Sequence, residues 1–160
     1  MISFPFDNTS QEVQDRNIDS DVFAEYLKRL TGGNNGVFAE VGTKMQVTAT
    51  GGMTVKVKPG DGFIEGRIFI NDIETELPIG SAESLDRIDT VVVRLSKANR
   101  ETTLAVVKGT ASSAPSAPAL TRESGVYELG LANVLVKKNT VNITQAEVTD
   151  TRLNDQRCGI

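Results

Sequence analysis

Residues of alternating polarity, interrupted at short intervals by turn-forming residues, constrain the fold of this chain more than any other feature. Apolar and polar side chains alternate within residues 45–49, 53–57, 64–70 and 73–79. This period of two is that of a strand with one buried face. Turn-forming residues separate these segments, namely Gly51-Gly52, residues 59–62 and Asn71-Asp72. The sequence therefore predicts four short strands that follow one another closely.

Two later segments, residues 88–96 and 126–136, are apolar on both parities. This pattern is typical of central strands that are covered on both faces. Residues 102–108 are expected to pair with residues 88–96. Residues 111–119 contain prolines and are expected to form a surface crossover. Residues 150–152 are expected to form a last short strand. Seven or eight strands at this spacing predict a mainly β fold, an antiparallel β-sandwich.

One long helix is expected before the strands. Apolar residues recur with helical spacing after residue 19, Asp19 or Ser20 can cap the first turn, and Gly32-Gly33 can end the helix. We therefore divide the chain into an N-terminal arm and helix, residues 1–35, for attachment and oligomer contacts, and a β-sandwich domain, residues 36–160. The expected assembly contacts are Phe4 and Phe6 of the arm, which must bury against their own domain or a neighbouring subunit, and Phe23, Tyr26, Leu27 and Leu30 of the helix.

The charge of the chain argues against nucleic acid as a partner. The net charge is −4, and lysines and arginines are scattered singly, so no basic stripe is available to neutralise a phosphate backbone. Residues 1–26 carry six carboxylates against Arg16 alone, which fits either a docking arm or a solvated terminus. No apolar stretch approaches the about 18 residues that span a bilayer. We expect a protein that is made in the cytoplasm, does not insert into a membrane, and leaves the cell only within a particle.

The chain contains no histidine, and this excludes most catalytic arrangements. Histidine is the usual general base and the commonest transition-metal ligand, and Ser-His and Cys-His nucleophiles require it. Cys158 is the single cysteine, so neither a disulfide within the chain nor a zinc site of cysteines is expected. We predict a protein that is not an enzyme and needs no cofactor.

Paired carboxylates are the remaining enzymatic possibility, since two acids can cleave a glycoside. Glu74 and Glu76 fall on the polar parity of a predicted strand and are interpreted as a solvated face. Asp86, Arg87 and Asp89 are interpreted as ion-pairing residues at the start of a central strand. Their possible partners are Arg94, Arg122 and Arg152.

A weak calcium candidate precedes the helix. Asp15, Asn17, Asp19 and Asp21 occupy positions 1, 3, 5 and 7 of a calcium-loop pattern. The pattern is incomplete, because Ser20 replaces the turn glycine and Tyr26 replaces the bidentate glutamate. The alternative is that Asp19 and Asp21 cap the helix and stabilise its dipole.

Several strings, in this order and spacing, resemble the N-terminal, shoulder-type module of tail-fibre, baseplate and receptor-binding proteins from phages and prophages of Gram-positive bacteria. They are Asp15-Arg16, Asp21-Val-Phe-Ala-Glu-Tyr-Leu27, Gly36-Val-Phe38, Met45-Gln-Val-Thr-Ala49, Met53-Thr-Val55, Arg87-Ile-Asp-Thr-Val-Val-Val-Arg94, Pro118-Ala-Leu-Thr-Arg122, Tyr127-Glu-Leu129, Ile143-Thr-Gln-Ala and Thr149-Asp-Thr-Arg152.

The resemblance covers nearly the whole chain and implies a trimeric β-sandwich that joins the tail tip of the virion and contacts other tail or baseplate proteins. Members of that family often continue into a receptor-binding head beyond the position of Ile160. The function expected of this chain is therefore attachment to the tail rather than direct recognition of a receptor. The alternative function is that of a carbohydrate-binding module that recognises host cell-wall saccharide through residues on a strand face.

Overall fold

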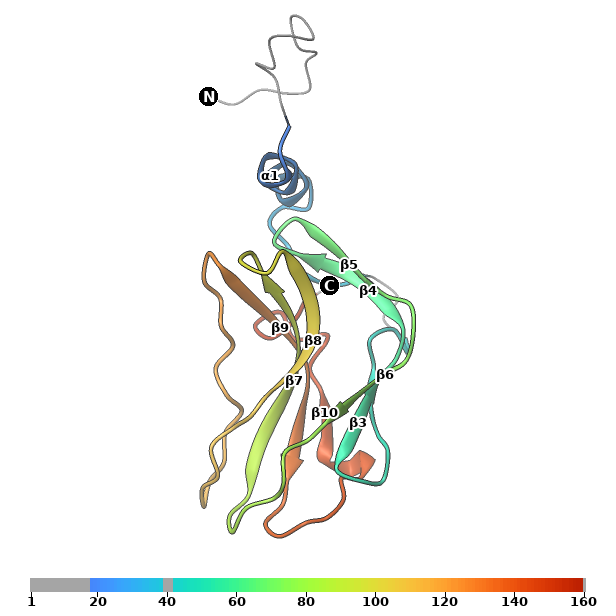
Figure 1. The fold of residues 1–160 in the computed structure, drawn as a ribbon, viewed down its shortest axis with the longest axis vertical. Helices are drawn as coiled ribbons and strands as arrows, with labels where there is room; N and C mark the ends of the chain where they lie inside the picture. Colours follow the sequence, from blue (N-terminus) through green and yellow to red (C-terminus); the bar gives the residue numbers. More distant parts are fainter. Residues whose placement is uncertain (1–17, 39–41, 160) are drawn as a thin grey trace, which may run out of the picture.

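The alternating segments form antiparallel strands, and the fold is mainly β, as the sequence predicts. The computed structural model describes residues 18–38 and 42–159 (Figure 1). Among these residues ten strands form three sheets, and β1, β2 and β10 are only two or three residues long. The elements are α1 (Ser20–Leu30), β1 (Gly36–Val37), β2 (Val47–Ala49), β3 (Thr54–Val57), β4 (Gly60–Ile64), β5 (Arg67–Asn71), β6 (Thr75–Pro78), β7 (Arg87–Ser96), β8 (Glu101–Val107), β9 (Val126–Val136), the 3₁₀ turn η1 (Gln145–Glu147) and β10 (Val148–Asp150).

The two segments that are apolar on both parities are the long central strands β7 and β9. They pair with each other in a four-stranded antiparallel sheet of order β10-β9-β7-β8. Side chains of both parities are buried along them, for example Val91, Val92 and Val93 in β7. The expected pairing of residues 102–108 is confirmed by β8, whose Leu104 lies opposite Val93.

The sheet β2-β3-β6 supplies the second layer of the sandwich. Its strands carry one buried parity, as the period of two predicts, with Val47, Val55 and Val57 inside. These residues join the core with Leu129 and Leu131 of β9. The hairpin at Gly51-Gly52 is confirmed by the pairing of β2 with β3.

The third sheet, β1-β4-β5, corrects the sequence interpretation of residues 59–70. Residues 59–62 were expected to be a turn and 64–70 one strand, but β4 begins at Gly60 and the turn lies at Glu65-Gly66. Both turn residues have positive φ, 49° and 74°, as a two-residue hairpin of type I′ requires. Gly62 lies within β4. Glycine is needed there because a Cβ would lie 2.3 Å from the carbonyl oxygen of Gly36 on β1.

The last strand also differs from its predicted position. Residues 150–152 were expected, whereas β10 spans Val148–Asp150 and pairs with β9. Arg152 therefore lies after the strand. Its guanidinium binds the Asp150 carboxylate and the carbonyl oxygens of Gly42 and Lys44. The capping box of Thr144 and Glu147 is present at η1.

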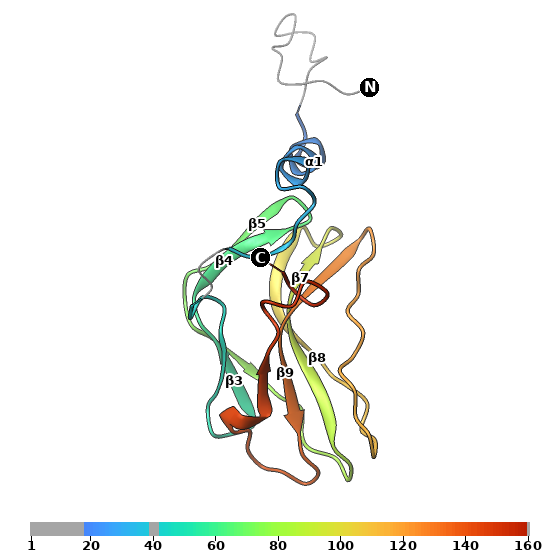
Figure 2. The same cartoon turned by 180° about the vertical axis from the view of Figure 1, so that it is seen from behind.

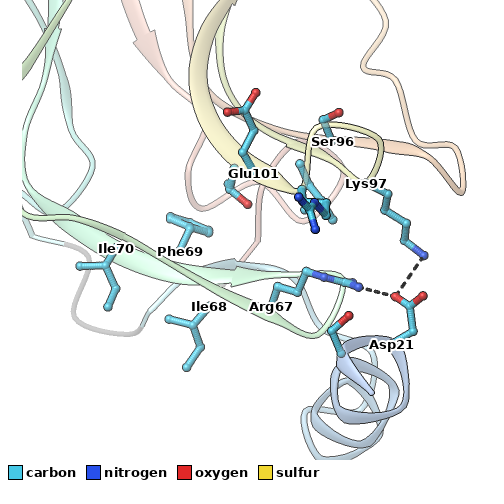
Figure 3. Close-up of a pocket in the computed structure, with 12 residues that line it drawn as sticks. Asp21, Arg67, Ile68, Phe69, Ile70, Ser96, Lys97 and Glu101 are labelled. Carbon is cyan, nitrogen blue, oxygen red and sulfur yellow. Dashed lines mark hydrogen bonds and ion pairs between the residues drawn. The ribbon is translucent and has the colours of Figure 1, made fainter. Parts of the chain in front are cut away.

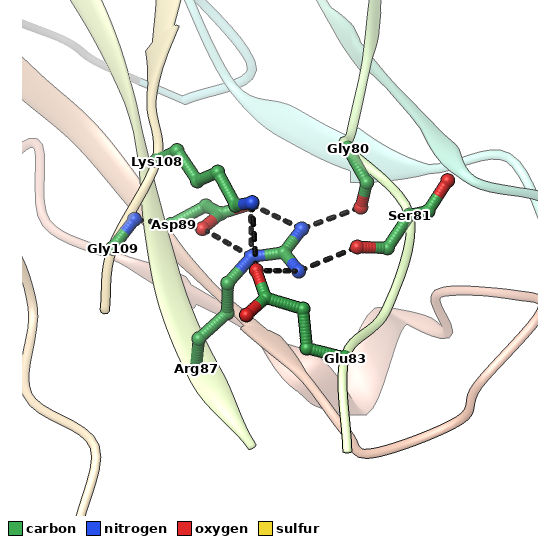
Figure 4. Close-up of polar contacts among 7 residues, drawn as sticks. All are labelled: Gly80, Ser81, Glu83, Arg87, Asp89, Lys108 and Gly109. Atoms are coloured by element: carbon green, nitrogen blue, oxygen red, sulfur yellow. Dashed lines mark hydrogen bonds and ion pairs between the residues drawn. The ribbon is translucent and has the colours of Figure 1, made fainter. Parts of the chain in front are cut away.

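A buried ion pair lies at the start of β7, as the sequence predicts, but its partners are different (Figure 4). Arg87 Nε donates to Asp89 Oδ1 at 2.9 Å, and both side chains are fully buried. The Arg87 guanidinium also donates to the carbonyl oxygens of Gly80 and Ser81. Asp89 Oδ1 accepts from the Gly109 amide at 2.9 Å.

The predicted partners of this cluster bind other groups. Arg94 pairs with Glu128, and Arg152 pairs with Asp150. Arg122 lies over the ring of Tyr127. The Arg87–Asp89 pair therefore ties β7 to the segment after β6 and to the segment after β8, so it fixes the three strands against one another.

Candidate assembly site

Helix α1 lies at one end of the molecule, beyond the sandwich and against the β4–β5 hairpin (Figures 1 and 2). The helix begins where the sequence predicts, because the Asp19 side chain accepts hydrogen bonds from the amides of Asp21 and Val22. Its contact with the hairpin is close. A Cβ on Gly66 would lie 1.9 Å from the Ala24 carbonyl oxygen, and Ala24 is the buried residue of the helix.

Ion pairs hold the helix on the hairpin. Lys28 Nζ lies 2.5 Å from Glu65 Oε2, and Arg67 Nη2 lies 2.5 Å from Asp21 Oδ1. Partial burial opposes ionisation of the Glu65 carboxyl, but hydrogen bonds from Lys28 and Asn35 outweigh it and hold its pKa below the usual range. The face of α1 that meets the body is therefore small and charged.

The apolar face of α1 points away from this contact. Phe23, Tyr26 and Leu30 are 52%, 41% and 65% exposed, and Leu27 is half-buried. These four predicted contact residues share one side of the helix through their spacing of three and four residues. The other two, Phe4 and Phe6, lie outside the described residues.

A second apolar patch, which sequence reasoning missed, consists of Ile68, Ile70 and Ile73. Each of them is more than half exposed. The sequence interpretation placed Ile64, Ile68 and Ile70 on one parity, but the Glu65-Gly66 turn reverses the chain between them. Ile68 therefore lies opposite Phe63, whereas Phe69 lies opposite Gly62 and is the buried residue of β5. The only sequence signal for this turn was Gly66, since glycine is favoured at the second central position of a type I′ hairpin.

The calcium candidate is divided by the boundary of the described residues. Asp15 and Asn17 lie outside them. Asp19 caps α1 and Asp21 lies in its first turn, as the alternative interpretation requires. Asp21 also pairs with Arg67. Within residues 18–38 and 42–159, no group of three or more histidine, cysteine, aspartate or glutamate side chains is placed to hold a metal ion.

The paired carboxylates are used in other contacts. Glu74 and Glu76 are exposed, and Glu74 Oε1 lies 3.0 Å from Lys56 Nζ. Asp86 Oδ1 accepts from the Lys138 amide at 2.7 Å. Asp89 binds Arg87 in the interior.

Cys158 is buried, and burial raises the pKa of its thiol to about 11. At neutral pH this thiol is therefore protonated and a poor nucleophile.

A polar pocket of about 280 Å³ lies at the base of the helical end. The loop after α1 contributes Asn34 and Asn35, and the C-terminal segment contributes Asp155. Arg122, whose guanidinium carbon is 5.3 Å from the centre of the Tyr127 ring, completes the wall. Amide, carboxylate and guanidinium groups of this kind can hydrogen-bond the hydroxyls of a small polar ligand.

No helix in the part of the chain that the structure describes is long and apolar enough to cross a membrane. No protein-family model matches this chain, and no curated protein matches it either.

Proposed function

We propose that this protein is a non-catalytic structural subunit of a phage tail tip or baseplate, which forms a homotrimer and attaches receptor-binding elements to the tail. The observation that carries the proposal is the orientation of α1, whose charged face contacts the body and whose apolar face points outward. A surface helix normally buries its apolar stripe. An exposed stripe of this kind marks a protein-protein contact.

The energy available from this face sets the size of the contact. Full burial of an exposed phenylalanine or leucine contributes about 1.5–3 kcal/mol, and Phe23 and Leu30 would gain less because both are already partly covered. Association costs about 4–15 kcal/mol in lost rigid-body freedom. The helix face alone is therefore too small for a stable complex. The proposed interface also includes Ile68 and Ile70 of the adjoining hairpin and Ile73 of the loop after β5.

The attachment function is tested by co-purification. We would co-express the affinity-tagged full chain with tail proteins encoded beside its gene and compare the wild type with Phe23→Ser/Leu30→Ser. The wild type is expected to retain a tail protein that the variant loses. Val141→Ser is the matched control, since Val141 is 82% exposed and lies in the loop after β9, at the end opposite α1. Failure of the wild type to retain any tail protein would contradict the proposal.

The second candidate function is carbohydrate binding, and the observation that favours it is the polar pocket of Asn34, Asn35, Arg122 and Asp155. A glycan array probed with the full chain tests it. Binding that is lost in Asp155→Ala would support recognition of cell-wall saccharide, and an array without signal would remove this candidate.

A further inference from the structure

A groove runs between two strand edges that belong to different sheets. β5 is the outer strand of the order β1-β4-β5, and β8 is the outer strand of the order β10-β9-β7-β8. A cavity of about 770 Å³ lies between β5 and the β7–β8 turn, and an adjoining cavity of about 240 Å³ continues along β8. Both cavities are lined by Phe69, Ile70 and Thr102, so they form one continuous groove.

The groove has an apolar floor and a charged rim (Figure 3). Phe69 points from β5 toward β8. Leu95 of β7 is also buried and lines the same cavity. Charged side chains surround this floor, namely Asp21, Arg67, Lys97, Arg100 and Glu101. Two strand edges above an apolar floor suit an extended peptide, which can hydrogen-bond a strand edge and place alternate side chains in the floor.

The N-terminal segment of this chain has the sequence that such a groove would take. Ile2, Phe4 and Phe6 alternate with Ser3, Pro5 and Asp7, so an extended conformation would place all three apolar side chains on one face. Pro5 falls on the opposite parity, where its missing N–H is tolerated if it points away from the paired strand.

Position and charge favour the same occupant. Ser20 and Asp21 line the groove, so the segment that precedes them joins the described chain at the mouth of the groove. Residues 8–17 can span at most about 33 Å when extended, which is enough to return a short strand along β5. The side chains of residues 1–17 carry Asp7, Glu12 and Asp15 against Arg16, a negative excess. The rim has a small positive excess, with Arg67, Lys97 and Arg100 against Asp21 and Glu101, and Arg67 already pairs with Asp21.

We propose that the groove between β5 and β8 binds residues 2–6 of the same chain, with Phe4 and Phe6 over the floor of Phe69 and Leu95. The tether makes the binding intramolecular, with an effective concentration in the millimolar range, about 1 mM, for a short flexible linker. The proposal concerns the single chain and does not depend on tail assembly. It assigns Phe4 and Phe6 to a contact within their own domain, whereas Phe23 and Leu30 remain available to partners.

Cysteine cross-linking of the full chain tests this assignment. Ser3→Cys and Thr102→Cys place one thiol on the polar parity of the segment and one on the groove wall. Buried Cys158 does not compete for a short bis-maleimide. The expected product is a cross-link within one chain, identified by its monomeric mass and by peptide mapping. Absence of this cross-link would overturn the proposal, and so would cross-linking only between chains, which would show that a second copy supplies the segment.

The apolar side chains are tested in the same two-cysteine background. Phe4→Ser/Phe6→Ser should lower the initial rate of cross-linking at least about tenfold, because each buried phenylalanine contributes more than the 1.4 kcal/mol that corresponds to a factor of ten. Phe23→Ser, which changes an exposed phenylalanine on α1, should leave the rate unchanged. Equal rates in all three proteins would overturn the proposal.

Hydrogen exchange provides a readout without engineered cysteines. In the otherwise unmodified full chain, Phe4→Ser/Phe6→Ser should reduce amide protection in residues 67–71 and 101–104, while β3 and β9 keep theirs. Unchanged protection along both groove edges would overturn the proposal.

Discussion

The sandwich and the cap, which consists of α1 and the β4–β5 hairpin, differ in where they place charged and apolar side chains. In the sandwich, apolar residues fill the interior, and the pair Arg87–Asp89 is fully buried among carbonyl and amide partners. In the cap, the pairs Lys28–Glu65 and Asp21–Arg67 lie between helix and hairpin. Ile64 and Phe69 are buried there, but other apolar side chains are exposed, namely Phe23, Leu30, Ile68 and Ile70. The buried pair of the sandwich thus contributes to the interior, whereas the cap carries the exposed apolar side chains that we propose as a contact surface.

The largest effect is expected from breaking the buried pair of the sandwich. Arg87→Ala leaves the Asp89 carboxylate and two carbonyl oxygens without their guanidinium partner, and should lower the free energy of unfolding by about 3–5 kcal/mol. Denaturant unfolding measures this loss. Lys56→Ala, which breaks the exposed pair with Glu74, should leave the free energy of unfolding almost unchanged, because solvent screens an exposed pair. Similar losses in the two variants would contradict the distinction between buried and exposed charge.

One substitution made in both regions compares their apolar residues. Leu129→Ala in the sandwich should cost about 2–5 kcal/mol, because it leaves a cavity in the core. Leu30→Ala in the cap should remain within about 0.5 kcal/mol of the wild type, because Leu30 is mostly exposed. The measurement is chemical denaturation at a protein concentration low enough to prevent association. A large loss for Leu30→Ala would show that the helix face is already buried in the single chain.

The seating of α1 is tested by Gly66→Ala. The new methyl group would collide with the Ala24 carbonyl, and alanine is also strained at a φ of 74°. The strain alone costs about 1–2 kcal/mol. Gly32→Ala is the matched control, since Gly32 has a φ of 65° but open space around it. Hydrogen exchange in α1 should accelerate more in Gly66→Ala, and equal acceleration would mean that the helix does not rest on the hairpin.

The smallest effect is a loss of stability in acid, located in the sandwich. Hydrogen bonds from Lys137 and Thr144 lower the pKa of Glu147 to about 2. The folded carboxylate binds its proton less readily than the unfolded one, whose pKa is about 4.3. Its contribution is therefore complete above that value and disappears as the pH falls toward 2. Glu147→Gln should flatten the dependence of unfolding free energy on pH in this interval, and an unchanged slope would contradict the assignment.

Local patterns predicted the sandwich better than they predicted the cap. Burial determines which positions are apolar, so it can be predicted from the side chains. Examples are the alternation at Val55 and Val57 and the apolar residues on both parities of β7 and β9. The turn was expected at Gly60 and Gly62, because glycines are typical of turns. In the structure these glycines allow close packing of strands, and the turn lies at Glu65-Gly66. The partners of Arg87 could not be predicted from the sequence either, since two of them are the backbone carbonyls of Gly80 and Ser81.

The outward orientation of α1 was only partly predictable. The spacing of Phe23, Tyr26, Leu27 and Leu30 indicated an apolar face, but a similar face is found on helices that pack on their own domain. The direction of that face depends on Ala24, Gly66 and the ion pairs of Asp21 and Lys28. Contacts between residues so distant in sequence do not produce a local pattern.

Sedimentation velocity of the full chain over a range of concentrations tests most directly whether the outward face of α1 is an interface. The wild type is expected to sediment as a trimer that dissociates on dilution. Phe23→Ser/Leu30→Ser should sediment as a monomer at every concentration with unchanged thermal stability. A wild type that remains monomeric throughout, or a variant that associates as strongly as the wild type, would contradict the assignment of this face to assembly.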